Sequence, residues 1–149
     1  MLKSDRQTDY AVRVLLALAK SGEGARLSNT NIQEAMLILP MLIARIVAQL
    51  AHAGLVNTFA GREGGCMLCR PVSQITLKDG VEAFEGLILL SEWMQAKSES
   101  DRPLRSDCPV RSKWGRVQVV MLREMDSSHS KNLRKKRLVF PWPCQVLLS

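Results

Sequence analysis

The alternation of apolar and polar positions predicts a series of short helices in the first part of the chain. Residues 8–20 place apolar side chains at helical spacing, with Thr8 or Asp9 as the N-terminal cap. A second helix is expected at 29–37, because the Ser28 hydroxyl can accept hydrogen bonds from the free amides of a first turn. The predicted inner face of this second helix is apolar and consists of Ile32, Ala35 and Met36.

A third helix is predicted at 41–53, after a turn at Leu39-Pro40. Pro40 suits the first turn of a helix because its missing amide hydrogen costs nothing there, and Gly54 is a typical stop. The polar face of this helix is narrow. Its core-facing positions are Leu42, Ile43, Ile46, Val47 and Leu50.

Two strands at 55–60 and 66–70 are expected next, joined by a glycine-rich tip. Gly61, Gly64 and Gly65 permit the positive-φ backbone that such a tip needs. Residues 28–71 therefore place a capped helix, a turn, an apolar helix and a hairpin in one order. That order predicts a winged helix-turn-helix, a small DNA-binding module with the third helix as its recognition helix.

The next segment is predicted to contain a short helix and a loop. Thr76 caps a helix at 77–84, and Gly86 ends it. The apolar segment 87–94 is ambiguous, whereas 95–107 is rich in charges and serines and is predicted to be a loop.

From 110 to 125 an amphipathic helix is predicted, and its wide stripe suggests packing against another protomer. The stripe consists of Val110, Trp114, Val117, Met121 and Met125. The predicted fold class is mainly α with a small β-hairpin wing. Residues 1–86 form the winged helix-turn-helix domain, 87–126 the connecting loop and dimerisation helix, and 127–149 a basic and then apolar tail.

The net charge of +7 adds less than it first suggests, because most of it lies in the tail. The basic residues there are Lys131, Arg134, Lys135, Lys136 and Arg137. Such a run is also typical of a solvated end, so charge alone does not identify DNA as the partner. No apolar run approaches the roughly 20 residues that cross a bilayer, and no signal peptide is apparent. We expect a cytoplasmic protein without membrane partners.

The candidate DNA-contacting residues come from three elements. Arg45 and Gln49 are the long polar side chains on the outer face of the recognition helix, which also carries Met41. Asn29 and Thr30 are placed to bind phosphate at a helix start, although ordinary capping explains them as well. At the wing tip, Arg62 is suited to the minor groove or is a solvated turn residue.

The cysteines allow several interpretations. Cys66 and Cys69 form a CxxC pair, a pattern found in metal and redox sites, but residues three apart on a strand point to opposite faces, which favours simple packing. Cys108 in a polar loop is a candidate thiol sensor. Neither histidine has partners at the spacing of a catalytic triad or zinc site, and the Glu82 and Glu85 pair is best explained as a solvated face. The sequence therefore predicts no enzyme.

The chain resembles the Rrf2 family of bacterial transcription regulators over about residues 1–126. The likeness rests on TDYAVRVLLALA, LPMLIARIVAQLAHAGLV, GREGGCMLCRP, ITLKDGVEAFEG and CPVRSKW, which occur in this order. The resemblance implies a dimeric winged-helix repressor or activator, a long dimerisation helix at about 111–126, and an arginine at the wing position of Arg62. Many members sense iron, nitric oxide or redox state through an iron-sulfur cluster.

The ligands that the resemblance implies for such a cluster are three cysteines, the last in a Cys-Pro pair, often with a histidine after it. Here only Cys108 matches: Trp93 stands where the first cysteine is expected, 95–107 contains none, and Arg111 occupies the region of the histidine. One cysteine per chain does not make an iron-sulfur site. We therefore predict a homodimeric operator-binding regulator without a family-type cluster or another cofactor.

Two alternatives remain open at this point. The first is a dimeric interaction module that has lost specific DNA binding. The second is a thiol-based or metal-dependent sensor that uses Cys66, Cys69 and Cys108.

Overall fold

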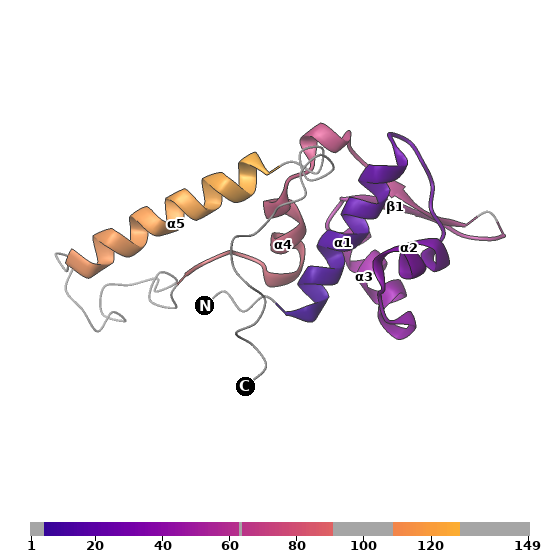
Figure 1. Ribbon diagram of the computed structural model, residues 1–149, viewed down its shortest axis with the longest axis horizontal. Coiled ribbons are helices and arrows are strands. Elements are labelled where there is room, and N and C mark those ends of the chain that lie inside the picture. Colours follow the sequence, from indigo (N-terminus) through magenta and orange to yellow (C-terminus); the bar gives the residue numbers. More distant parts are fainter. Residues whose placement is uncertain (1–4, 63, 91–108, 129–149) are drawn as a thin grey trace.

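The first four helices pack together, the β-hairpin joins them through the first and the third, and a fifth helix extends away from them (Figure 1). The computed structural model describes residues 5–62, 64–90 and 109–128. Its elements are α1 (Arg6–Ser21), α2 (Asn29–Met36), α3 (Pro40–His52), β1 (Val56–Phe59), β2 (Gly65–Leu68), the 3-10 turn η1 (Val72–Gln74), α4 (Leu77–Glu85) and α5 (Pro109–Ser127). This order confirms a mainly α fold with a hairpin wing. The predicted loop at 95–107, Cys108 and the tail from 129 onward lie outside the described residues.

The core forms around α1, which contacts α2, α3 and α4. The predicted inner face of α3 is confirmed, since Ile43, Ile46, Val47 and Leu50 are all buried and Leu42 is half-buried against the same core. Complete burial of each such side chain contributes about 1.5–3 kcal/mol to the free energy of unfolding. On α2 only Ile32 is fully buried, and the prediction that Ala35 faces the core is wrong. An eight-residue helix has only two turns, so a small side chain away from its centre does not reach the core.

The start of α1 differs from the sequence prediction. Its cap is Asp5, whose carboxylate accepts a hydrogen bond from the Arg6 amide at 2.6 Å. Thr8 instead lies inside the helix, where it is buried and its hydroxyl donates to Glu85 Oε1 at 2.7 Å. Glu85 therefore joins α4 to α1, and the prediction that it belongs to a purely solvated face is wrong.

The hairpin is antiparallel, with Val56 opposite Leu68 and Phe59 opposite Gly65. It is also bound to the loop between α1 and α2, because Leu27 and Cys66 exchange two backbone hydrogen bonds of 3.0 and 2.8 Å. Gly65 adopts φ +137°, and a Cβ there would overlap the Leu27 carbonyl oxygen. This close approach fixes the base of the wing against the helical domain.

The tip glycines differ in their roles. Gly61 has the expected positive φ of +93°, but Gly64 does not. Gly64 is required by space instead, because a Cβ there would lie 2.7 Å from the Gly61 carbonyl oxygen and 2.8 Å from that of Phe59. The tip is therefore folded back tightly on its own backbone.

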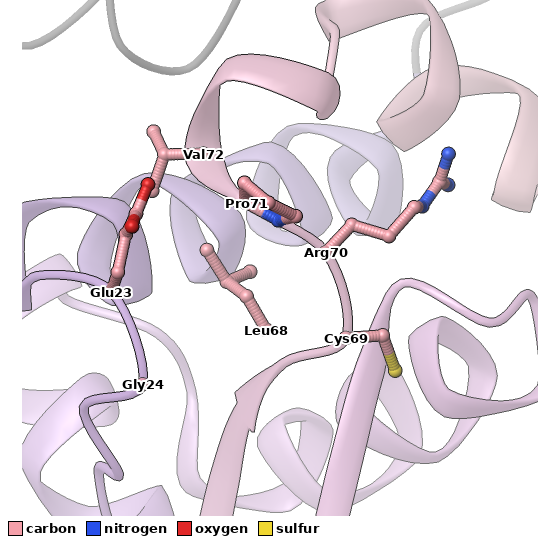
Figure 2. A pocket seen from close by; sticks show the side chains of 7 residues that line it. All are labelled: Glu23, Gly24, Leu68, Cys69, Arg70, Pro71 and Val72. Carbon is pink, nitrogen blue, oxygen red and sulfur yellow. The ribbon is translucent and has the colours of Figure 1, made fainter.

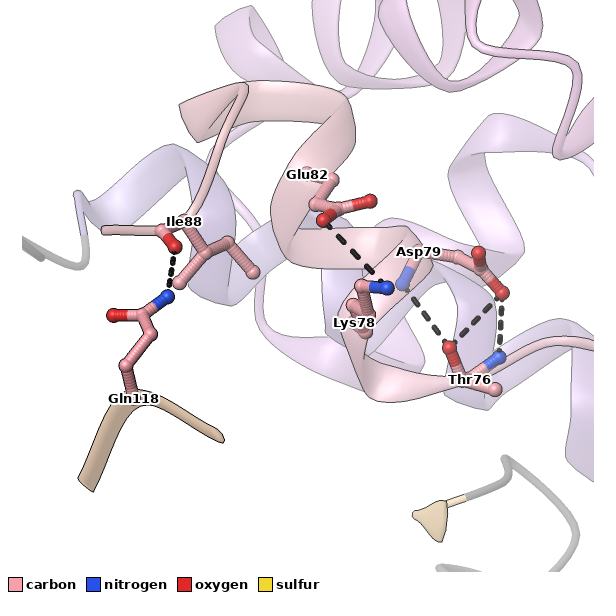
Figure 3. Close-up of polar contacts among 6 residues, drawn as sticks. All are labelled: Thr76, Lys78, Asp79, Glu82, Ile88 and Gln118. Carbon is pink, nitrogen blue, oxygen red and sulfur yellow. Dashed lines mark hydrogen bonds and ion pairs between the residues drawn. The ribbon is translucent and has the colours of Figure 1, made fainter. Parts of the chain in front are cut away.

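Figure 3 shows the contacts that fix the start of α4 and the attachment of α5. The Thr76 hydroxyl accepts from the Asp79 amide at 3.2 Å, while the Asp79 carboxylate accepts from the Thr76 amide at 2.9 Å, which completes a capping box. On α5 the buried Gln118 amide donates to the Ile88 carbonyl and accepts from the Leu90 amide. The middle of α5 is thereby joined to the segment after α4.

The remaining apolar surface of α5 has few contacts within the described residues. Val110, Trp114 and Val117 are 57, 43 and 51% exposed, whereas Met121 and Met125 are half-buried. The backbone carbonyl of Ser128 accepts from the Leu77 amide at 3.0 Å, so the C-terminal end of α5 lies near α4 and the other end projects outward (Figure 1). Among the described residues no single helix is long and apolar enough to cross a membrane; the bent α2–α3 pair passes that test only when taken together.

Candidate nucleic-acid interface

The α2 and α3 helices form a helix-turn-helix. Three residues, Leu37 to Leu39, join them, and the chain direction changes by 114°, as this motif requires. Leu37 adopts the left-handed conformation at φ 53° and ψ 48°. The next amide, that of Ile38, donates back to the Gln33 carbonyl at 3.1 Å, and the Ile38 side chain is buried. This is the Schellman type of helix end, here with leucine where glycine is usual.

The outer face of α3 is exposed to solvent over its whole length. Met41 is 82% exposed, and Ala44, Arg45, Ala48 and His52 are exposed as well. No side chain caps the start of α3, whereas Asp5, Ser28 and Thr76 cap the other three helices of the domain. Pro40 has no N–H and the Leu42 amide donates to the Leu39 carbonyl at 2.9 Å, so it is mainly the helix dipole that makes this end of α3 favourable for an anionic partner.

Gln49 does not belong to that outer face, contrary to the sequence prediction. Its side chain is half-buried, and its Nε2 donates to the Ala83 carbonyl of α4 at 3.1 Å. The amide is therefore used inside the domain, and we leave Gln49 out of the DNA-contacting set. The difference arises because α3 packs against α4 on the side where Gln49 lies, which the sequence period alone does not reveal.

One arginine lies at the tip of the wing, and a second, which the sequence did not indicate, contacts the wing from outside it. Arg62 is exposed at the tip, as predicted. Arg26 lies in the loop before α2, with its guanidinium carbon 3.7 Å from the centre of the Phe59 ring. Stacking of this kind holds the flat guanidinium at a fixed place on the wing. No local sequence signal marks Arg26, because the contact depends on the bridge between Leu27 and the hairpin.

The start of α2 has the predicted cap. Ser28 Oγ accepts from the Asn31 amide at 3.1 Å. Asn29 is half-buried and Thr30 is exposed in the same first turn. Both residues are therefore near a helix N-terminus, as expected from the sequence.

The charge along the sequence from α3 to Arg62 favours an anion. Between Glu34 and Glu63 the sequence contains no acidic residue, while Arg45 and Arg62 supply positive charge. Charges of one sign on a surface attract a partner of the opposite sign before contact is made. The helix-turn-helix and wing together are thus suited to a polyanion.

The two hairpin cysteines have different environments. Cys66 is fully buried, and burial raises the pKa of its thiol to about 11. Cys69 is exposed beyond the end of β2, so the prediction that it is a packing residue is wrong. A cavity of about 200 Å³ is lined by Glu23, Gly24, Leu68, Cys69, Arg70, Pro71 and Val72. Figure 2 shows that the Cys69 thiol and the Arg70 guanidinium point away from its centre.

These residues do not fit a shared metal site. A thiol with a raised pKa is a poor ligand because metals bind the thiolate, and Cys66 is buried whereas Cys69 is exposed. Within ranges 5–62, 64–90 and 109–128, no three His, Cys, Asp or Glu side chains are grouped as metal ligands. Between Leu87 and Pro143 the sequence holds one cysteine, Cys108, which is too few for an iron-sulfur cluster.

Comparisons with known proteins agree with this geometry. A family model described as Rrf2, an iron-dependent transcriptional regulator, matches residues 4–135. Protein aau3 of Rhizobium meliloti (strain 1021) is 39% identical over 108 residues, which are 72% of this chain and 68% of that protein.

Two solved structures have the same fold. CymR, the global cysteine regulator of B. subtilis, superposes with a TM-score of 0.74 at 25% identity, covering 89% of this chain and 96% of that one. IscR of T. potens gives a TM-score of 0.69 at 24% identity, covering 90% and 87%. The chain therefore belongs to the Rrf2 family of winged-helix transcription regulators.

Proposed function

We propose that the protein is a homodimer that binds a roughly two-fold symmetric DNA operator through one α3 and one wing from each protomer. The observation that carries this proposal is the exposed outer face of α3 beside the Arg62 wing, in a stretch of sequence without a carboxylate. The cytoplasm is the compartment we propose, because the operator would be met there. The proposed DNA-contacting residues are Asn29, Thr30, Met41, Arg45 and Arg62.

Each proposed contact has a distinct role. The Arg45 guanidinium has the fork of donors that pairs with the O6 and N7 atoms of guanine in the major groove. At the wing tip, Arg62 is suited to the narrow minor groove, where the negative potential is enhanced. Asn29 and Thr30 would bind phosphate at the start of α2 and fix the position of the domain without selecting sequence.

The dimer is proposed from the exposed stripe of α5. Val110, Trp114 and Val117 leave large apolar areas in water, and burial against a second copy would recover about 25 cal/mol per Å² of that area. Two-fold symmetric contacts of this kind would place the two recognition helices on opposite halves of an operator.

The DNA-binding proposal is tested by selecting duplexes from a randomised library and measuring affinity by fluorescence anisotropy over a salt series. Arg62→Ala should lower the slope of log K against log salt by about 1, whereas Arg45→Ala should cost about 1–3 kcal/mol and relax one base preference. Arg116→Ala, which removes the same charge from the exposed surface of α5, is the matched control. It should change neither the salt slope nor the affinity for the selected duplex. Failure to enrich any sequence would favour an interaction module that has lost specific DNA binding.

The dimer proposal needs a separate measurement, sedimentation equilibrium. Val117→Glu places a charge in the exposed stripe and should shift the protein toward monomer. Val119→Glu is the matched control, because Val119 is similarly exposed, at 48%, but two residues away and on another side of the helix. If both variants remain dimeric, α5 does not form the interface through this stripe.

We propose that regulation does not use a cluster of the family type, because the cysteine set does not supply its ligands. Thiol oxidation is a second candidate, favoured by the exposure of Cys69. Elemental analysis and a visible spectrum of anaerobically purified protein test the first statement, and operator affinity with and without peroxide tests the second. Stoichiometric iron with visible absorption would refute the first statement, and an operator affinity that responds to peroxide equally in wild type and Cys69→Ser would refute a role for Cys69.

A further inference from the structure

An exposed apolar patch occupies the place in the fold where α3 would meet DNA. The turn patch consists of Leu37, Leu39 and Met41, which are 81, 44 and 82% exposed. Burial of large apolar side chains is favourable, so their exposure to water is costly. Three of them within five residues form a contiguous apolar patch and not isolated exposed residues. The described part of the chain does not cover this patch.

The patch is continuous with the proposed DNA-binding face. Leu39 is the N-cap of α3, and Met41 is its second residue. Arg45 follows Met41 by four residues, so the two side chains lie on the same face of the helix, one turn apart. The first turns of a recognition helix are the part that reaches base edges in a helix-turn-helix.

The surrounding charge selects the class of partner. The uncapped start of α3 and Arg45 favour an anion; the carboxylates that flank this part of the sequence are Glu34 on α2 and Glu63 after Arg62, and the stretch between them contains none. Duplex DNA is a partner that offers both features, because its phosphates are negatively charged and its major groove also presents an apolar group that Met41 could contact. In the major groove the apolar group on a base edge is the 5-methyl group of thymine.

We infer that Met41, with Leu39 beside it, contacts thymine methyl groups, so that the operator is selected by thymine as well as by guanine. This inference rests on the proposed function. Methionine is unbranched and flexible, so its side chain can follow the groove surface to reach a methyl group. Adenine has no amide partner from Gln49, because that side chain donates to Ala83. The expected half-site therefore carries a guanine opposite Arg45 and one or more thymines opposite the start of α3.

The test replaces individual thymines of a selected duplex by deoxyuridine, which removes the methyl group and keeps every hydrogen-bonding atom. The probe is a fluorescently labelled duplex obtained from the randomised library. Wild type should lose about three- to five-fold in affinity at one or more thymines in each half-site, as expected for one methyl group returned to water. Met41→Ala should lose a similar factor on the thymine duplex and almost nothing more on the deoxyuridine duplex.

This non-additivity is the decisive readout, because contacting groups couple and distant ones add. Arg62→Ala is the control and should lower affinity by the same factor on both duplexes. Since Met41 is 82% exposed, Met41→Ala should keep the melting temperature of the wild type, which shows that any loss of affinity is not a loss of folding.

Several outcomes overturn the inference. Selected duplexes without thymine in their half-sites, or equal effects of Met41→Ala on both duplexes, would refute it while leaving the DNA-binding proposal intact. A change of sedimentation coefficient in Met41→Ala would instead identify the turn patch as a contact between copies. If wild type enriches no sequence at all, the proposed function and this inference both fail.

Discussion

Leu37 sits in a backbone conformation that suits glycine, and replacing it should stabilise the protein. It has φ 53° and ψ 48° at the end of α2, and it is the sole non-glycine residue with positive φ among the described residues. In that conformation the Cβ of an L residue lies too close to the following carbonyl oxygen. Leu37→Gly removes this contact. It also removes a side chain that is 81% exposed, so little burial is lost.

The magnitude follows from two opposing terms. The left-handed conformation costs a residue with a Cβ about 1–2 kcal/mol. Glycine gives back about 0.5–1 kcal/mol, because its unfolded chain has more conformations to lose. The net gain in the free energy of unfolding is about 0.5–1 kcal/mol. For a domain of this size that gain raises the melting temperature by about 2–5 °C.

Thermal and urea unfolding, followed by circular dichroism at one fixed protein concentration, measure this gain. Leu37→Ala is the matched control, because alanine loses the same exposed side chain but keeps the Cβ. It should unfold within about 0.5 kcal/mol of wild type, since exposed substitutions have small effects. If Leu37→Gly is no more stable than Leu37→Ala, the turn does not hold residue 37 in the left-handed conformation, and the geometry given for the helix-turn-helix is wrong.

The remaining predictions concern stability and the thiols. Thr76→Ala should destabilise the domain by about 1 kcal/mol in urea unfolding by removing the capping box with Asp79, and Thr76→Ser should retain most of it. Gln118→Leu should cost about 1–3 kcal/mol, because two backbone partners lose their hydrogen bonds, and limited proteolysis should then release α5 earlier. In native protein a thiol reagent should label Cys69 and spare Cys66; equal rates would contradict the burial of Cys66. Because burial raises the Cys66 pKa from 9.0 to about 11, its stabilising contribution should be complete below pH 9 and be lost toward pH 11, a loss that Cys66→Ala should lack.

Periodicity and end signals predicted the presence and order of the domain helices, although not the cap that begins α1. Ile43, Ile46 and Leu50 recur at the spacing of one helical face, and all three are buried in α3. Pro40 and Gly54 also mark their ends as predicted. These signals work because a proline or a glycine acts through its own backbone, whatever the rest of the fold does.

The errors fall where a residue depends on a distant part of the chain. Gln49 has the spacing of an outward residue, yet α4 takes up its amide. Thr8 is of a residue type that is common at helix N-caps, yet it is buried inside α1 and donates to Glu85. In both cases the partner is more than thirty residues away, so no local pattern could reveal it.

The sequence by itself determined the order of elements, the apolar faces that pack together and the absence of the cysteines that a family-type cluster needs, because each depends on residue type and short-range spacing. The tertiary structure decided which outward residues remain available. Gln49 is not available for DNA because its amide donates to Ala83, Arg26 stacks on Phe59, and Met41 remains exposed on the same face as Arg45. These outcomes depend on which elements meet in space, since packing between distant segments determines which polar groups are paired and which apolar surface remains in water.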